Sequence, residues 1–465
     1  MKKILGLFLA ALLLLSCLPA LAESEETVVT VATWQNSILM EEMLERFNAT
    51  HPGIKAVTHE LNGGWFDHTA LLEAAASGSM PDVFVITTPE IPVSNGWMMD
   101  LTPYLEAETE KTWYDATIMK YDGKTYILPY SIYFYGVIVN KTLLNELNIP
   151  IPGYDWTVDE FFSIIEQASK PGYYGINGSD AIITHIAPQL NPETGWALIN
   201  TNLQEYNLDD TFIEVVNRTK EVRDRGYAID TVGAGLEGDE YAAKCQEVLG
   251  TDSVYNAYLQ GKVALTPDFS WSLSLDTADG FGGWDWDFYP LPVSEKGNRT
   301  RSGIVADGAG ILATTANPDA AFEVLKWITY SPEGYQARLE IAESYDKDEM
   351  MAKYPQYTED KFEAKLGMAD LPGCFTAETI QAWSAINQPK PGAAYAIAGI
   401  PYGYVDGYKC VPGWSPSQWD ILWPTINNEL LTGNKAAADI AVELKEKCDA
   451  AVAEAYAAMG IDLSK

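Results

Sequence analysis

Residues 121–141 read YDGKTYILPYSIYFYGVIVNK, and this stretch decides the fold. Six of its residues are aromatic, and it contains no histidine, no cysteine and no closely spaced pair of acids. The aromatic and β-branched run after Pro129 favours one long strand that ends at the Asn140–Lys141 turn. Because side chains alternate along a strand, we expect one face to carry Ser131, Tyr133 and Tyr135.

Upstream of this stretch, strand and helix patterns alternate. Residues 27–34 (TVVTVATW), residues 53–61 (GIKAVTHEL) and the segment from Val83 read as strands, with helical periodicity between them. This order predicts a parallel sheet covered by helices on both faces. Ligands bind beyond the carboxyl ends of such strands, so we expect site residues directly after them. These residues are Asn36, Trp65, Thr88 and Glu90. Trp34 also follows the first strand, but large residues at this position more often pack beneath the cleft.

Downstream, a second α/β region runs to about residue 290. Thr157 and Glu160 have the spacing of a capping box at a helix start. Residues 298–336 predict another strand and then a helix capped by Asn317, with Pro318 at its first position. Residues 423–456 predict a pair of helices. Residues 340–415 have few clear elements and read as an insertion near a surface cleft.

Six segments, in this order, resemble one family: LLEAAASGSMPDVFVI, GWMMDLTPYL, residues 122–161, GKVALTPDFSW, GAGILATTANPDAAFEVLKWITYSPEG and LLTGNKAAADIAVELKEKCDAAV. They are similar to the extracellular solute-binding proteins of family 1, the maltodextrin-binding-like receptors of ABC importers. The resemblance implies an α/β, two-lobe periplasmic-binding-protein fold (type II-like), with a mostly parallel sheet in each lobe. It implies an N-terminal lobe of residues 27–130 and 303–340. The C-terminal lobe is then residues 131–302 and 341–465, with the insertion at about 340–415.

The same resemblance implies a function. Such a receptor binds a sugar or oligosaccharide in the interlobe cleft and delivers it to a membrane permease. An aromatic face covers the apolar face of a sugar, and Tyr or Trp adds polar reach at its edge. The family pattern therefore implies ligand contacts from Tyr133, Trp271, Asp307, Trp414 and Trp419, with the choice among Trp414, Trp419 and Trp423 open. Asp180 and His185 are weaker candidates at the cleft edge.

The N-terminus predicts export. Lys2 and Lys3 precede an apolar run that is too short to span a bilayer, and Ala20–Ala22 offers a cleavage site after residue 22. Leu14–Cys17 allows a second interpretation, a lipoprotein anchored through Cys17. We therefore expect an extracellular or periplasmic protein. The four remaining cysteines, which are Cys245, Cys374, Cys410 and Cys448, predict free thiols or one structural disulfide.

Composition limits the partners. With 30 basic and 65 acidic residues, the net charge is −35, which argues against a nucleic-acid partner. Four histidines without ligand spacing argue against a metal site, and we expect no cofactor and a monomer. No catalytic motif is present, so we expect no enzyme. Two alternatives stay open: a peptide or polyamine ligand on the same fold, and a secreted glycoside hydrolase.

Overall fold

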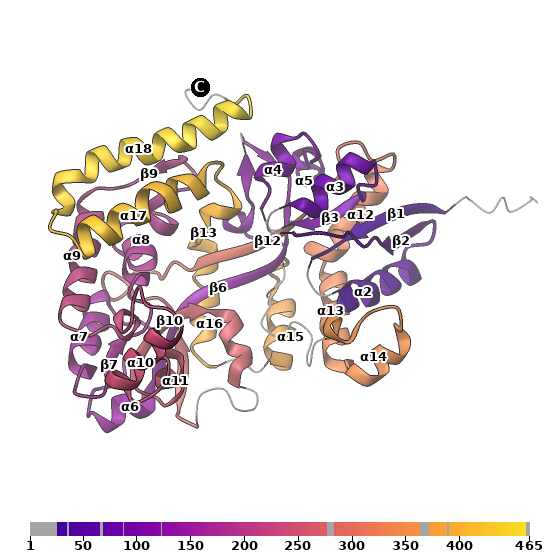
Figure 1. The fold of residues 1–465 in the computed structure, drawn as a ribbon. Coiled ribbons are helices and arrows are strands. Elements are labelled where there is room, and N and C mark those ends of the chain that lie inside the picture. The colour runs from indigo at the N-terminus through magenta and orange to yellow at the C-terminus, as the bar shows by residue number, and fades with distance from the viewer. Residues whose placement is uncertain are drawn as a thin grey trace, which may run out of the picture.

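A computed structural model describes residues 26–34, 37–65, 68–86, 88–121, 123–276, 283–362, 371, 373–387 and 390–461. The chain forms two α/β lobes that are joined by long strands through the middle of the molecule (Figure 1). The expected signal segment lies outside the described residues. Within them, no helix has both the length and the apolar character needed to cross a membrane.

One nine-stranded mixed sheet runs through both lobes, with the main order β2-β1-β3-β12-β6-β10-β7. Strand β6 (Leu128–Asn140) is the long strand expected from the sequence. Its first half pairs with β12 (Gly303–Ile311), and its second half pairs with β10 (Val263–Phe269) and β11 (Trp286–Tyr289). Both lobes therefore share β6 as a structural element.

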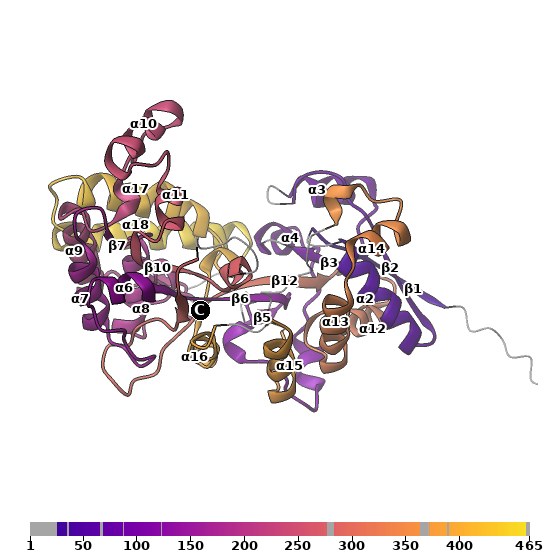
Figure 2. The same cartoon turned by 90° about the horizontal axis from the view of Figure 1, so that it is seen from below.

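In the first lobe, β1, β2 and β3 are parallel, as expected, but β12 is antiparallel to both β3 and β6. The sheet is mixed, and not mostly parallel, because β12 enters it from the other lobe and runs antiparallel to β3 and β6. Helices cover its two faces in Figures 1 and 2. The elements of this lobe are β1 (Thr27–Ala32), α2 (Ser37–Thr50), β2 (Ile54–Thr58), α3 (Thr69–Ser77), β3 (Val83–Ile86), α4 (Glu90–Ser94), α5 (Thr102–Ala107), β4 (Lys120–Tyr121), β5 (Lys124–Thr125), α12 (Pro318–Thr329), α13 (Pro332–Ser344) and α14 (Lys347–Lys353).

The second lobe packs its helices around the other half of the sheet. Here only β7 and β10 are parallel, since both β10 and β11 run antiparallel to β6. Its remaining elements are α6 (Lys141–Glu146), α7 (Val158–Ala168), β7 (Tyr174–Ile176), α8 (Ala187–Leu190), β8 (Ile199–Asn200), β9 (Glu205–Tyr206), α9 (Asp210–Asp224), α10 (Gly238–Leu249), α11 (Val254–Leu259), α16 (Ala393–Ile397), α17 (Trp423–Thr425) and α18 (Ala437–Ala458). Strand β13 (Tyr404–Val405) pairs with β12 at the crossing, and α15 (Ala377–Asn387) lies between the lobes (Figure 1).

Local sequence signals explain several element starts. The capping box at α7 is confirmed: the Thr157 hydroxyl accepts from the Glu160 amide, and the Glu160 carboxylate accepts from the Thr157 amide. Helix α12 begins with Pro318, as predicted, but the Asn317 side chain makes no capping hydrogen bond. Proline at the first position needs no donor partner, so the helix starts there without a side-chain cap.

The boundary expected at residue 341 differs from the packing. Helix α14 and the residues after it lie on the first lobe, where Tyr354 and Phe362 pack with Ile38 of α2. The Lys353 ammonium lies 2.6 Å from Glu42 and 2.7 Å from Glu45, both on α2. These long-range ion pairs carry no periodic signal in the sequence, so residues 341–362 were expected in the other lobe.

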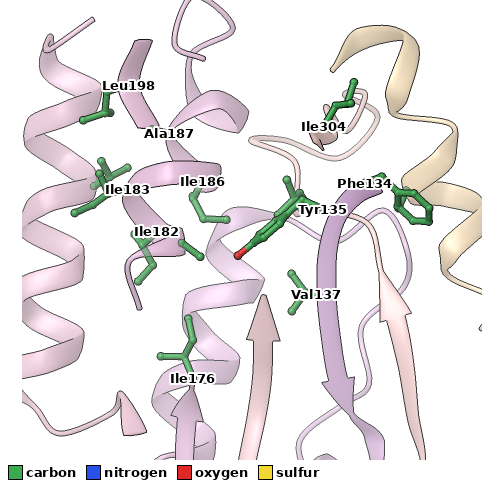
Figure 3. Packing of buried hydrophobic residues seen from close by; sticks show 14 of the residues in the cluster. Phe134, Tyr135, Val137, Ile176, Ile182, Ile183, Ile186, Ala187, Leu198 and Ile304 are labelled. Carbon is green, nitrogen blue, oxygen red and sulfur yellow. The ribbon is translucent and has the colours of Figure 1, made fainter. Parts of the chain in front are cut away.

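Tyr135 marks the point where β6 enters the core of the second lobe. Its ring extends from β6 toward Ile182 and Ile186, while Phe134 points away on the opposite face (Figure 3). Tyr135 is only 7% exposed. The expected alternation along β6 therefore leads to burial on both faces at this position.

Candidate functional site

The carboxyl ends of β1, β2 and β3 face the second lobe. Strand β12 is antiparallel to β3, and β6 is antiparallel to β12, so β6 runs in the same direction as β1–β3. Since β6 continues into the second lobe, the ends of the three parallel strands point toward that lobe. The residues expected after these strands therefore lie on the wall of the first lobe that meets the second lobe. Asn36 belongs to this set but lies outside the described residues.

Glu90 links this wall to the second lobe. It is the first residue of α4, and its carboxylate accepts a hydrogen bond of 3.4 Å from the amide of Gly413. Burial raises the pKa of Glu90, while the bond from Gly413 opposes this shift. Thr88 lies beside it and is buried. The contact brings the end of β3 next to the segment that begins at Trp414.

The rings of Tyr133 and Trp271, both predicted to contact the ligand, meet on one face of β6. Their ring centroids are 5.4 Å apart in an edge-to-face arrangement. Trp271 is 42% exposed, so a large part of its ring remains available to a ligand. Hydrogen bonds to the Asp268 carboxylate from Ser272, the Phe269 amide and the Trp271 side chain fix this turn.

A row of rings continues from Trp271 into the second lobe. The ring centroids of Phe269 and Trp271 are 4.1 Å apart. On its other side Phe269 stacks on Trp196, with centroids 5.6 Å apart. Edge-to-face and offset-stacked pairs of this kind stabilise one another beyond simple burial. The row therefore forms a rigid aromatic surface whose exposed end is Trp271.

His185 lies beneath this surface and not at its edge. Its ring stacks on Tyr135 with centroids 3.6 Å apart, and its Nδ1 lies 3.2 Å from the hydroxyl of Tyr404. Burial lowers the pKa of His185 to about 3, so the imidazole is neutral at pH 7. His185 is 3% exposed and supports the aromatic surface from below.

A cavity of about 500 Å³ opens beside the same surface, and we name it the tryptophan cavity. Four tryptophans line it, which are Trp196, Trp414, Trp419 and Trp423. Asp180, Asn427 and Asn428 add polar groups to the lining. Trp419 is 58% exposed and stands perpendicular to the buried Trp414, with centroids 5.6 Å apart. All three tryptophans between which the sequence could not choose therefore reach one cavity.

A second and smaller cavity, of about 170 Å³, lies at the ends of β1 and β2, and we name it the outer cavity. Its lining includes Trp34, Trp65, His59 and Glu60, and two residues from beyond α14, Tyr357 and Lys361. Trp34 and Trp65 are both partly buried. Of the first-lobe residues expected at the site, Trp65 therefore lies apart from Thr88 and Glu90, nearer to the edge strand β2.

Comparison with known proteins now adds to this geometry. The model of the family described as bacterial extracellular solute-binding proteins matches residues 32–334, which is more than half of the chain. The chain belongs to this family. A lipoprotein of Streptomyces antibioticus, itself uncharacterised, is 28% identical over 192 residues, which are 38% of this chain. The match spans 42% of that relative's length.

Several solved structures share the fold of this solute-binding protein. An ABC substrate-binding protein of Listeria monocytogenes in complex with cycloalternan has a TM-score of 0.59 at 18% identity, covering 94% of this chain and 100% of the other. A sugar transporter protein of Rhizobium etli in an open conformation has a TM-score of 0.67 at 17% identity, covering 91% and 99%. A cyclic α-maltosyl-1,6-maltose binding protein of Arthrobacter globiformis has a TM-score of 0.64 at 14% identity, covering 92% and 99%.

In this solute-binding protein, Asp307 has a partner within the chain. Its carboxylate lies 2.6 Å from the Lys409 ammonium, and both side chains are buried. The β12–β6 register shifts between Asp307 and Gly308, where β6 carries one extra residue, Tyr130, at the crossing. Burial raises the pKa of the neighbouring Asp406 to about 6, with Lys409 opposing the shift. A sugar contact by Asp307 stays a prediction, since Lys409 occupies one of its oxygens.

Asp180 is the carboxylate that borders the tryptophan cavity of the solute-binding protein. Arg223 donates a hydrogen bond of 2.6 Å to one of its oxygens, and the side chain remains half exposed. Burial raises the pKa of Asp180, while Arg223 opposes this shift. Arg223 also donates to Ser179, so the carboxylate is held in place by a side chain of α9.

The sequence alone missed several residues of the site. Trp196, Asp268, Asn427 and Asn428 lie at the aromatic surface or the tryptophan cavity and were not among the predicted site residues. Only Asp268 had a local signal, its position in the segment that ends at Trp271. The four cysteines are buried free thiols, and among the described residues no three His, Cys, Asp or Glu side chains gather as metal ligands would.

Proposed function

We propose that this protein is the extracytoplasmic binding receptor of an ABC importer, and that it takes a sugar or oligosaccharide between its two lobes. The observation that carries the proposal is the aromatic surface from Tyr133 and Trp271 to the tryptophan cavity. Exposed rings there stand next to carboxamides and one carboxylate. Rings cover the apolar faces of a sugar, and amides and carboxylates bind its hydroxyls.

Family membership supports delivery of the ligand to a permease in the membrane. Solved relatives of the same fold are described as sugar-binding or sugar-transport proteins, among them a maltotriose complex from Bdellovibrio bacteriovorus. The predicted export segment and the lipoprotein relative agree with a position outside the cytoplasmic membrane. In this proposal the protein acts as a monomer. Ligand binding changes the arrangement of its two lobes, and the permease recognises the ligand-bound arrangement.

The proposal includes binding without turnover. Glycoside hydrolysis normally uses two carboxyl groups on opposite sides of the scissile bond. Among the described residues that line the tryptophan cavity, Asp180 supplies the one carboxylate. Arg223 donates a hydrogen bond to that group and holds it in place.

A thermal-shift screen followed by calorimetry tests this function. Ligand that binds only the folded state raises stability by about 2.7 kcal/mol at a hundredfold excess over Kd. We expect a carbohydrate to raise the melting temperature, and polyamines and short peptides to leave it unchanged. A shift with a polyamine or peptide alone would replace the sugar by another solute on the same fold. Cleavage products after a day of incubation would indicate a hydrolase.

A further inference from the structure

The outer cavity lies at the far end of the first-lobe wall. Its residues follow β1 and the edge strand β2, whereas Thr88 and Glu90 follow β3. Neighbouring strands are about 4.8 Å apart, so the end of β2 lies about 10 Å from the end of β3. The outer cavity is therefore displaced from the Glu90–Gly413 contact, away from the hinge strands.

Two residues of this cavity come from outside the part of the chain that matches the family. The family match ends at residue 334, whereas Tyr357 and Lys361 follow α14. The family match therefore assigns these two residues no role.

The segment that carries them is held firmly on α2. The Tyr354 hydroxyl donates to Glu42 at 2.7 Å, and the Tyr357 hydroxyl donates to Glu41 at 2.8 Å. The Thr58 hydroxyl, at the end of β2, donates to the same Glu41 oxygen at 2.7 Å. Glu41 therefore holds Tyr357 next to the end of β2, which also lines the cavity.

The cavity has the chemistry of a place for one sugar unit. Its volume equals about six water molecules at about 30 Å³ each. The rings of Trp34, Trp65 and Tyr357 supply apolar surface, and Glu60 supplies an acceptor. Lys361 is exposed and forms no ion pair with the residues that the structure describes. Its ammonium has three donors for hydroxyl or carboxylate oxygens.

We propose that the outer cavity is a subsite for the terminal unit of an oligosaccharide, and that Lys361 makes the protein favour chains of several units over a single sugar. This inference rests on the proposed function. The inner units of the chain lie against Trp271 and the tryptophan cavity, and the outer unit lies between Tyr357 and Trp65. The segment after α14 thus adds length selectivity to a family fold.

Calorimetry with two series of probes tests the subsite. The probes are glucose, maltose, maltotriose and maltotetraose, and xylose with its oligomers of two to four units. In the series that the wild type binds, Lys361→Met should weaken binding of the three- and four-unit chains about tenfold or more, because a hydrogen bond to a charged donor is lost. The single sugar should bind the variant as it binds the wild type.

Lys347→Met is the matched control. Lys347 lies on α14 of the same segment, but it pairs with Glu359 and does not line the cavity. This variant should bind every chain length like the wild type. Equal affinity of Lys361→Met and wild type for long chains overturns the subsite, and so does an equal loss for single sugars. If the wild type binds no probe, the proposed function itself fails, and the subsite with it.

Discussion

Tyr133 and Tyr135 should respond in opposite ways to the same substitution. They lie two residues apart on one face of β6, yet their surroundings differ. Tyr133 is partly exposed and contacts Trp271 at the edge of the aromatic surface. Tyr135 is buried between His185 and Phe269, at centroid distances of 3.6 and 4.6 Å. We expect Tyr133→Ala to weaken ligand binding and Tyr135→Ala to weaken folding.

The magnitudes follow from burial. Truncating a buried aromatic residue to alanine costs about 3–5 kcal/mol of folding stability, which applies to Tyr135. Tyr133 is only partly covered, so its truncation should cost about 1 kcal/mol of stability or slightly more. Loss of its ring against a ligand should remove about 1–3 kcal/mol of binding free energy, by analogy with bases stacked on open aromatic platforms. At about 1.4 kcal/mol per decade, this is roughly a 5- to 150-fold rise in Kd.

Two measurements separate the effects: denaturation by guanidinium chloride without ligand, and calorimetric titration of the folded variants with the sugar found in the screen. Tyr135→Ala should lose several kcal/mol of stability while its folded fraction keeps affinity within a few fold. A Tyr133→Ala variant that unfolds far more easily and still binds normally would show that Tyr133 is a core residue and that the ligand lies elsewhere. Tyr133→Phe is the control, since it keeps the ring.

Three further outcomes are expected. Lys409→Met leaves the buried Asp307 carboxylate without its partner and should cost about 3–5 kcal/mol in urea denaturation, whereas adding Asp307→Asn should recover much of this loss. The pKa of His185 is about 3 in the folded protein and about 6.5 when unfolded, so below pH 6.5 the unfolded chain binds a proton that the folded protein does not. The free energy of unfolding should therefore decrease by up to about 1.4 kcal/mol for each pH unit below 6.5. His185→Gln should flatten that slope between pH 6.5 and 4 in denaturation curves. Small-angle scattering should give a smaller radius of gyration with saturating ligand, and an unchanged radius would contradict closure.

Local patterns predicted the elements that depend on short-range order. The strand around Tyr133, the helix start at Thr157 and the parallel strands before Trp34 and Thr88 all follow from periodicity and caps. Mixed pairing at β12 could not be read from the sequence, because its partners on β6 and β3 lie between 170 and 228 positions away along the chain. The lobe that holds α14 was also missed, since ion pairs from Lys353 to α2 decide it.

The candidate site divides in the same way. Tyr133, Trp271 and the tryptophans near residue 419 were predicted from the segments in which they stand, and the structure places them at the aromatic surface or the tryptophan cavity. Trp196 was not found, since its place beside Phe269 depends on the packing of a short turn. For Asp307 the residue was noticed but its buried partner Lys409 was not, because the two are 102 residues apart.

The pairing of β3 with β12 has a consequence for how the chain is made. These strands are neighbours in the sheet, but Ile86 of β3 faces Gly308 of β12, which lies 222 positions further along the chain. At synthesis rates of about 5–20 residues per second, the ribosome needs about 10–40 s to supply the partner of β3. During that time the first lobe has no complete sheet, and its non-local pairing is slow to form even afterwards. For a chain with the predicted export segment, we expect this delay to keep the first lobe unfolded while a translocation channel threads it.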